Sequence, residues 1–423
     1  MKFELPYHTR KMEIEIEDRY VAGVLVSKVE EYKSEATPQQ LVAASLDNPT
    51  GSPRLEELAR GKKNIVIISS DHTRPVPSAV IMPQLLERIR RTAPDAKVTI
   101  LVAAGTHRAS THEELVAKYG EKIASDEHIV MHYSLNDSEM VKIGTLPSGG
   151  ECIINRVAYD ADLLVAEGFI EPHLFAGYSG GRKSVLPGIS SFKTIMANHC
   201  GEFVASPFAR PGILEKNPIH TDMLYAARTA KLKFIVNVVL NGDRTIIASF
   251  AGDTDAAHLQ GCAFLDKLAR APKVMSDITV TTNGGYPMDQ NIYQGVKGMV
   301  SAEATTNDGG AIIMVAGLSD GAGGEGFFKN LSQVKTAQEH LDKIAHTPRL
   351  ETVPDQWESQ VLARILSKHP VIIVSDMIDP KVVKDMHMEY AGSFAEALQR
   401  ARALKGKESK ITVIPNGLAV VVS

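Results

Sequence analysis

The stretch "NIVIISSDHTRPVPSAVIMPQLLERIRRTAPDAKVTILVAAG", residues 64–105, decides the fold class of this 423-residue chain. Its first seven residues form an apolar, β-branched run, which is typical of a buried strand. Apolar residues then recur at helical spacing through 78–94, and a second apolar run follows at 97–105. A strand, a helix and a strand within about 40 residues indicate a βαβ unit, so we expect a parallel sheet.

The same alternation continues along the chain and predicts two α/β lobes, each built on a mostly parallel sheet with flanking helices and with a cleft between them. The first 50 residues are predicted to form short strands and a polar helix. We place the domains at 1–270 and 271–423, with the boundary near 270 to 276. The other expected elements of the first lobe are helix 111–119, strands 127–132 and 162–170, a hairpin across 234–252 that turns at Asn241-Gly242, and helix 254–270. Those of the second lobe are strands 277–285, 310–318, 370–377 and 410–417, with helices 288–306, 330–343, 355–368 and 393–404.

The composition excludes several classes of protein. Hydrophobic residues make up 44% of the chain, charged residues 23%, and the net charge of −4 gives no sign of binding to nucleic acid or an anionic membrane. The three cysteines, Cys152, Cys200 and Cys262, are far apart and predict neither a disulfide framework nor a thiolate zinc site. No signal peptide and no apolar run of about 18 residues is evident, so we expect a cytoplasmic protein.

Polar residues gather where three predicted strands end. In parallel α/β sheets, ligands bind beyond the carboxyl ends of the strands. Two loops of the second lobe, "NGGYPMDQNIYQGVKG" and "GLSDGAGGEGFF", also follow strands, so two such edges would face each other across a cleft. The residues at the three strand ends of the first lobe are Asp71, His72, Thr73 and Arg74; His107 and Arg108; and Glu171, His173 and Lys183.

The loop "HLFAGYSGGRKSVLPG", residues 173–188, is similar to a phosphate-binding loop but departs from it at one position. The triphosphate-binding pattern G-x-x-x-x-G-K-[ST] needs glycine where this chain has Arg182, because the backbone there wraps tightly around phosphate. The glycines remain able to cradle a single phosphate with backbone N–H groups. The alternative is a simple turn that leaves Lys183 on the surface.

Two histidines at neighbouring strand ends, His107 and His173, are candidates for general acid and base catalysis, since imidazole titrates near neutral pH. They are equally able to bind a metal, or to serve only as structural hydrogen-bonding residues. The metalloprotease pattern H-E-x-x-H is absent. His199, near the end of a predicted helix, has no assigned role unless a metal lies beside it.

Arg74 and Trp357 each have two interpretations. A guanidinium at a strand end suits a carboxylate or phosphate, but it can also form a salt bridge with Asp71. Trp357 is the only tryptophan and either packs in the core or forms the wall of a pocket.

The motifs "SSDHTRPVP", "GTHR", "HLFAGYSGGRKSVLPGI", "TIMANH", "NGGYPMDQNIYQGVKG" and "VPDQW" together resemble the nickel-pincer nucleotide-dependent lactate racemase family along essentially the whole chain. The resemblance implies a cofactor-binding and catalytic N-terminal domain and a C-terminal domain that closes over the site. It implies a pyridinium-3-thioamide-5-thiocarboxylate mononucleotide whose ring carbon and two sulfurs hold nickel, and partner enzymes that make this cofactor.

The resemblance also assigns roles to residues of this chain. Lys183 would carry the cofactor through the thioamide, and His199 would be the protein ligand to nickel. His107 and His173 would be the acid and base. The remaining assignments are Arg74 and Lys297 for the substrate carboxylate, Tyr293, Gln294 and Trp357 for the lining of the substrate site, and Asp71, Gly180, Gly181 and Ser184 for contact with the cofactor.

The implied reaction is racemisation of a 2-hydroxy acid by removal of the C2 hydride and its return to the opposite face. Two bases, one on each face, serve such a reaction. Lactate is the expected substrate. Thr106 departs from the resemblance, because a bulky apolar residue would precede the catalytic histidine there. A 2-hydroxy acid with a longer or more polar side chain than lactate would therefore also fit. Two alternatives stay open: a zinc-dependent hydrolase using His107, His173 and His199, and a non-catalytic protein that binds or stores the cofactor.

Overall fold

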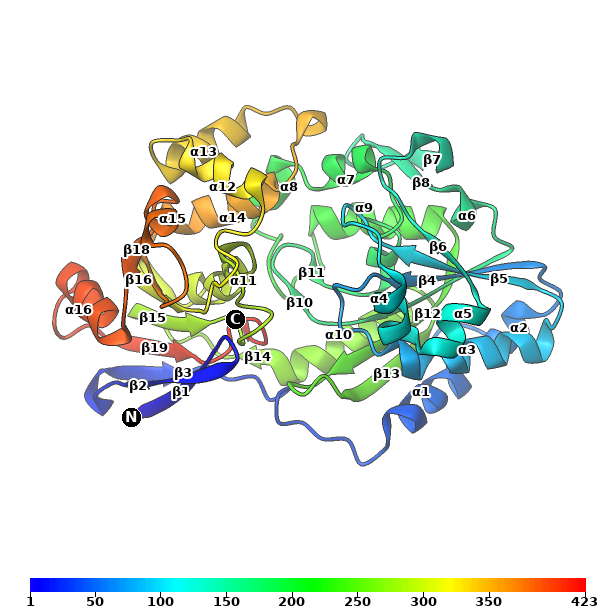
Figure 1. Cartoon of the computed structure of the whole chain (residues 1–423), viewed down its shortest axis with the longest axis horizontal. Helices are drawn as coiled ribbons and strands as arrows, with labels where there is room; N and C mark the ends of the chain where they lie inside the picture. The colour runs from blue at the N-terminus through cyan, green and yellow to red at the C-terminus, as the bar shows by residue number, and fades with distance from the viewer.

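A computed structural model describes the chain from residue 1 to 423 and contains two six-stranded sheets, one in each lobe (Figure 1). The first has the order β13-β12-β9-β4-β5-β6 and the second β18-β17-β16-β15-β19-β3. All neighbours run parallel except β12 and β13. The strands of the first sheet are β4 (Asn64–Ser70), β5 (Lys97–Ala103), β6 (His128–Met131), β9 (Leu163–Phe169), β12 (Leu232–Leu240) and β13 (Ile246–Gly252). Those of the second are β3 (Val21–Val24), β15 (Ser276–Thr282), β16 (Thr306–Val315), β17 (Val371–Val374), β18 (Glu389–Ala391) and β19 (Ile411–Ile414).

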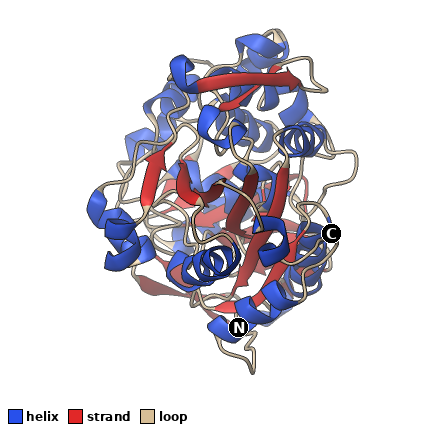
Figure 2. Cartoon of the chain, turned by 90° about the vertical axis from the view of Figure 1, so that its right-hand side faces the viewer, coloured by secondary structure: helices blue, strands red, loops and turns tan.

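Helices cover both faces of these sheets (Figure 2). Successive side chains of a strand point to opposite faces, and in β4 Ile65 and Ile67 join one hydrophobic core while Val66 and Ile68 join another. The helices of the first lobe are α1 (Pro38–Asp47), α2 (Leu55–Ala59), α3 (Ser78–Thr92), α4 (His112–Tyr119), α5 (Glu121–Asp126), α6 (Arg156–Tyr159), α7 (Phe192–Asn198), α8 (Gly201–Ala205), α9 (Pro218–Thr229) and α10 (Ala256–Ala269). Those of the second are α11 (Ile292–Glu303), α12 (Glu325–Ser332), α13 (Ala337–Ala345), α14 (Gln356–Leu366), α15 (Pro380–Asp385) and α16 (Phe394–Lys405). Both faces are therefore buried, which explains why the strands read as continuous apolar runs.

The predicted α/β class with two parallel sheets is confirmed, and β4 spans the predicted residues 64–70. One predicted helix, 330–343, is wrong, because α12 ends at Ser332 and α13 begins at Ala337. The side chain of Thr336 caps α13 by accepting a hydrogen bond from the backbone N–H of Glu339, which starts a new helix there. Short strand pairs that the periodicity did not predict are β7 (Met140–Thr145) with β8 (Glu151–Asn155), β10 (Pro172–His173) with β11 (Gly177–Tyr178), and β14 (Arg270–Ala271) with β20 (Val421–Val422).

The N-terminus departs from the expected domain division. The hairpin of β1 (Lys2–Tyr7) and β2 (Arg10–Glu15) packs on the second sheet, and β3 pairs with β19 at the edge of that sheet. Figure 1 shows this blue segment beside the red C-terminal strands. The first 24 residues thus belong with the C-terminal lobe and not with a domain of 1–270. A strand of four residues carries too little pattern to reveal its partner.

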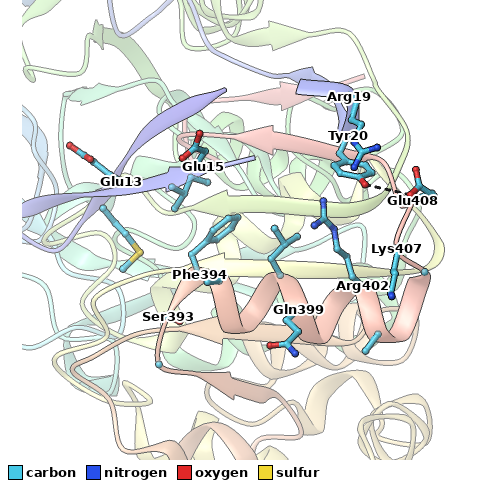
Figure 3. Close-up of a pocket in the computed structure, with 17 residues that line it drawn as sticks. Glu13, Glu15, Arg19, Tyr20, Ser393, Phe394, Gln399, Arg402, Lys407 and Glu408 are labelled. Carbon is cyan, nitrogen blue, oxygen red and sulfur yellow. Dashed lines mark hydrogen bonds between the residues drawn. The ribbon is translucent and has the colours of Figure 1, made fainter. Parts of the chain in front are cut away.

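A groove of about 1340 Å³ lies between β2 and α16 (Figure 3). Its walls include Tyr20, whose ring carries Arg19 and Arg402 at 4.6 and 4.3 Å from the ring centroid. None of the residues predicted to carry chemistry lines this groove. The three cysteines are free and buried. No helix combines the length and the apolar character needed to cross a membrane.

Leu5→Ala tests whether the N-terminal hairpin is part of the second lobe's core. Leu5 is fully buried, so its truncation is expected to lower the free energy of unfolding by about 2–5 kcal/mol in urea titrations. Leu135→Ala is the control, because Leu135 is 77% exposed and its loss should change stability by less than about 0.5 kcal/mol. Equal stability of the two variants would contradict this packing.

Candidate active site

The candidate site begins at the carboxyl ends of three adjacent strands. β4 lies between β5 and β9, so the segments that follow these strands emerge side by side. Asp71 and Arg74 follow β4, His107 follows β5, and His173 lies in the short strand β10 after β9. The strand order therefore brings together residues that are about 100 positions apart in sequence. The three strand ends lie side by side in the fold, as predicted.

Asp71 holds His107. The carboxyl oxygen Oδ2 of Asp71 lies 2.7 Å from Nδ1 of His107, and the hydroxyl of Thr73 donates to Oδ1 at 2.7 Å. Burial alone would raise the pKa of Asp71, but the bonds from His107 and Thr73 outweigh it and lower the pKa below its ordinary value. The ionised carboxylate directs the Nδ1–H of His107 toward itself and leaves Nε2 free to accept a proton. Asp71 pairs with His107, not with Arg74 as one interpretation of the sequence proposed.

His173 and Lys183 are in direct contact. Nε2 of His173 lies 3.3 Å from Nζ of Lys183, while the N–H groups of Phe175 and Ala176 donate to Nδ1 at 3.5 and 3.3 Å. A neutral imidazole that accepts at Nδ1 carries its proton on Nε2, so the amine of Lys183 accepts that proton through its lone pair. Lys183 is therefore an uncharged amine in this arrangement.

Electrostatics agree with this assignment. Burial, followed by the charges of Arg182 and Arg74, holds the pKa of Lys183 well below its ordinary value. Burial is also the largest cause that holds the pKa of His173 well below its ordinary value. Both shifts favour the uncharged forms, and an uncharged lysine is a nucleophile.

Arg182 turns inward and organises the glycine loop. It is 1% exposed, and its guanidinium donates to the carbonyl oxygens of Ala176 and Tyr178 at 2.7 and 2.8 Å and to Nδ1 of His220 at 3.0 Å. Arg182 thus binds backbone carbonyl groups of its own loop, whereas the backbone of a triphosphate loop wraps around its ligand. The sequence-based exclusion of a triphosphate loop agrees with this geometry.

Gly180 and Gly181 are required by the turn itself. Both have positive φ, 76° and 54°. A side chain at Gly180 would lie 2.7 Å from Oδ1 of Asn237, and one at Gly181 would lie 2.7 Å from the ring of His258. The space beside both glycines is filled by protein, so packing and backbone conformation account for them without a ligand.

His199 caps the end of α7 and faces the second lobe. Its Nδ1 lies 3.0 Å from the carbonyl oxygen of Ile195, which leaves Nε2 without a protein partner. Its ring packs edge-on against Phe175 and Trp357, at centroid distances of 5.3 and 5.0 Å. Burial is the main cause that lowers the pKa of His199 to about 3, so the ring is neutral and suited to a metal.

The protein's own side chains do not form a complete metal site. No three His, Cys, Asp or Glu side chains gather closely enough to hold a metal ion. A zinc hydrolase site built from His107, His173 and His199 needs such a group, so the geometry disfavours that alternative. A metal at His199 would take its other ligands from a bound cofactor.

The second lobe contributes two packed helices, α11 and α14. On α11, Nζ of Lys297 donates to Oε1 of Gln294 at 2.8 Å. Between the helices, Nε1 of Trp357 donates to the hydroxyl of Tyr293 at 3.3 Å. Because Trp357 also touches His199, these side chains form the wall of the site that faces the first lobe.

Glu171 and Glu358 are acidic residues of the site, and the sequence analysis assigned a role to neither of them. Burial raises the pKa of Glu171, and the charges of Lys297, Arg74 and Lys183 oppose this rise. Burial raises the pKa of Glu358 to about 8, with Lys297 again opposing it. Glu171 was recognisable only as a strand-end residue, and Glu358 had no signal beyond its position next to Trp357.

The chain matches known proteins along nearly its whole length. The family model of the lactate racemase N-terminal domain matches residues 7–212, and that of the lactate racemase C-terminal domain matches 271–422. The lactate racemase of Lactiplantibacillus plantarum is 61% identical over 419 residues, which cover 99% of each chain. The chain belongs to the lactate racemase family. The lactate racemase of Thermoanaerobacterium thermosaccharolyticum is 51% identical over 99% of this chain and 98% of its own.

Solved structures agree with this lactate racemase assignment. The lactate racemase apoprotein from Thermoanaerobacterium thermosaccharolyticum superposes with a TM-score of 0.97 at 50% identity, covering all of both chains. A protein from Thermotoga maritima, 18% identical, has a TM-score of 0.66 over 92% of this chain and 99% of its own, and shares the fold. The resemblance inferred from the motifs is therefore confirmed at the level of the family.

Selective acylation tests the neutral state of Lys183. In protein whose Lys183 carries no adduct, limiting acetic anhydride at pH 7 should modify Lys183 roughly tenfold faster than surface lysines, because only the uncharged amine reacts. Peptide mass spectrometry measures the rates between pH 6 and 9. A rate at Lys183 that climbs with pH in parallel with the surface lysines would contradict the assignment.

Proposed function

We propose that the protein interconverts D- and L-lactate, using a nickel-pincer nucleotide attached to Lys183. The observation that carries the proposal is the 61% identity to a lactate racemase over 99% of each chain. The contacts support it: Nε2 of His173 lies 3.3 Å from Nζ of Lys183, and the ring of Phe175 packs against those of His173 and His199. His107 follows β5, which pairs with β4 in the same sheet. Enzymes that make and insert the cofactor are the partners that this function requires.

The residues fit such a cofactor. Lys183 offers a neutral amine for a covalent link, and His199 offers a neutral Nε2 with no protein partner. His199 belongs to no cluster of three metal-ligating side chains, so a metal held there would need its remaining ligands from the cofactor. When bound, this group supplies a hydride acceptor and donor for C2 of the substrate.

Proton transfer falls to two histidines held in different ways. Nε2 of His107 is free to take the hydroxyl proton because Asp71 binds Nδ1. His173 is neutral, and Nδ1 is held by backbone N–H groups, so its chemistry also takes place at Nε2. One base on each face allows the proton to leave from one enantiomer and arrive at the other.

The substrate carboxylate is held by cations from both lobes. Arg74 comes from the first lobe and Lys297 from the second, so the carboxylate stays anchored while the planar 2-keto acid turns. Trp357 and Tyr293 form an aromatic wall that limits water. Thr106 is exposed beside His107, and we propose that it faces the side chain of the substrate.

Lys183→Ala is the direct test of the proposal. The wild-type protein, produced together with the maturation enzymes, should show an adduct of mononucleotide size by intact mass spectrometry and racemise lactate. The variant should show the bare mass and no racemisation, because it lacks the proposed attachment point and no other lysine forms a hydrogen bond with His173. Racemisation at the wild-type rate by the variant would refute the proposal. If the wild-type protein carries the adduct but turns over no 2-hydroxy acid, the protein would be one that stores the cofactor.

His107→Ala and His173→Ala separate proton transfer from metal binding. Each should lower kcat by about 10²–10⁴-fold and leave one nickel ion per chain, because neither residue is the proposed ligand. His199→Ala should instead lose nickel. Racemisation is followed by chiral chromatography and nickel by plasma mass spectrometry. Loss of nickel from either of the first two variants would mean that a base has been mistaken for a ligand.

A further inference from the structure

Glu167 is a buried carboxyl group of β9 that the proposed reaction does not use. It is 2% exposed, and its Oε1 accepts hydrogen bonds from two serine hydroxyls, that of Ser69 at 2.5 Å and that of Ser78. Both serines are fully buried. Polar groups at this depth are costly without partners, so the two bonds hold the three side chains together.

The two serines stand at opposite ends of the loop that carries Asp71 and Arg74. Ser69 is next to last in β4, and Ser78 is the first residue of α3, so residues 71–77 belong to neither element. The backbone of this loop forms hydrogen bonds only within itself and with the first turn of α3. The carboxyl group therefore closes the loop by bringing both of its ends to one oxygen atom.

The same network reaches the segment that carries His107. Tyr119, the last residue of α4, donates from its hydroxyl to Oγ of Ser69 at 2.8 Å. Nζ of the preceding Lys118 donates to Oγ of Ser70 at 3.1 Å. Because α4 follows His107 on the connection after β5, the segment of this histidine and the segment of its carboxylate partner are both fastened to the end of β4.

We infer that Glu167 is a positioning residue, which closes the loop and so sets Asp71 against His107, and this inference rests on the proposed function. A loop released at one end would displace the carboxylate that orients His107, and with it Arg74, the proposed anchor of the substrate. Displacement of such groups by about 1 Å lowers rates by as much as about 10²-fold. Glu167 acts through the loop and is not itself a catalytic residue.

Glu167→Met and Ser78→Ala test the closure of the loop. Methionine has a similar length and no oxygen acceptor, so both serine bonds are lost, whereas Ser78→Ala frees only the end at α3. In holoprotein with wild-type contents of nickel and adduct, kcat for lactate should fall about 10²-fold in the first variant and about tenfold in the second. The double variant should be no worse than Glu167→Met, because both changes remove the same closure.

Ser78→Ala, the milder change, decides the question by itself if Glu167→Met does not fold. Wild-type kcat in Ser78→Ala would overturn the inference. So would losses that multiply in the double variant, because the two residues would then act independently.

Glu167→Gln is the conservative variant. Its amide oxygen accepts the same two hydroxyls, and its nitrogen takes the place of Oε2, which has no hydrogen-bond partner. Because the closure is kept, kcat should stay within about threefold of the wild type. A loss as large as that of Glu167→Met would show that closure through the acceptor is not the cause, and would overturn the inference.

Ser276→Ala is the matched control. Ser276 is 1% exposed, and its hydroxyl donates to the carbonyl oxygen of Ile278 at 2.8 Å. It is the first residue of β15, at the end of the strand opposite to the one that leads to the site. The variant should lower the temperature of unfolding and leave kcat unchanged. An equal fall of kcat in Ser276→Ala and Ser78→Ala would mean that lost stability alone explains both, which contradicts a positioning role.

A second measurement needs neither cofactor nor substrate. In full-length protein with ¹⁵N-labelled histidine, the ring-nitrogen shifts of His107, assigned with His107→Ala, show which nitrogen carries the proton at about pH 8.5, where imidazole is neutral. The bond to Asp71 favours the proton on Nδ1. Glu167→Met and Ser78→Ala should shift it toward Nε2, and Glu167→Gln and Ser276→Ala should not. Wild-type shifts in Glu167→Met overturn the inference. Absence of lactate turnover by the wild-type holoprotein refutes the proposed function, whatever these spectra give.

Discussion

The site depends on the hydrogen bonds of one buried cation, Arg182. Its guanidinium holds the carbonyl oxygens of Ala176 and Tyr178, which lie between His173 and Lys183 in sequence. Burial lowers the pKa of Arg182 to about 10, so it keeps its charge at neutral pH. Because no carboxylate neutralises it, that charge acts on the adjacent Lys183 and favours the neutral amine. One residue therefore shapes the loop and adds to the effect of burial in lowering the pKa of the lysine that follows it.

Charge balance is the second constraint on the site. Arg74, Lys183 and Lys297 come together with Asp71, Glu171 and Glu358, but Asp71 is committed to His107. Keeping Lys183 neutral limits the repulsion among the cations. The two remaining cations, Arg74 and Lys297, then come from opposite lobes. If the substrate carboxylate binds between them as proposed, it would relieve this repulsion and would couple substrate binding to closure of the site.

The sequence predicted the backbone better than the contacts between side chains. Apolar runs such as 64–70 mark strands buried on both faces, and strands that end in polar residues placed His107 and His173 at one edge. Periodicity did not predict that β3 crosses to the second sheet, because four residues carry too little pattern. Nor did it predict the pairing of Asp71 with His107 or the hydrogen bonds that Glu167 accepts. Such contacts depend on how separate elements pack, and local sequence does not encode that packing in a readable form. The roles of Lys183 and His199 came from family resemblance alone.

The path of the chain limits how the lobes can move. It enters the first lobe after β3 and leaves it after α10, so two covalent crossings join the lobes. The pairing of β14 with β20 adds a tie next to the second crossing. Two crossings define an axis, and for any closure of the lobes we expect a rotation about that axis. Rotation about that axis would move Trp357 and Lys297 together, because α11 and α14 are packed against each other and joined by the bond from Trp357 to Tyr293. Trp357 would then reach His199 in the same movement that brings Lys297 to the substrate carboxylate. Closure would therefore complete the surroundings of the proposed nickel ligand and of the substrate in one step.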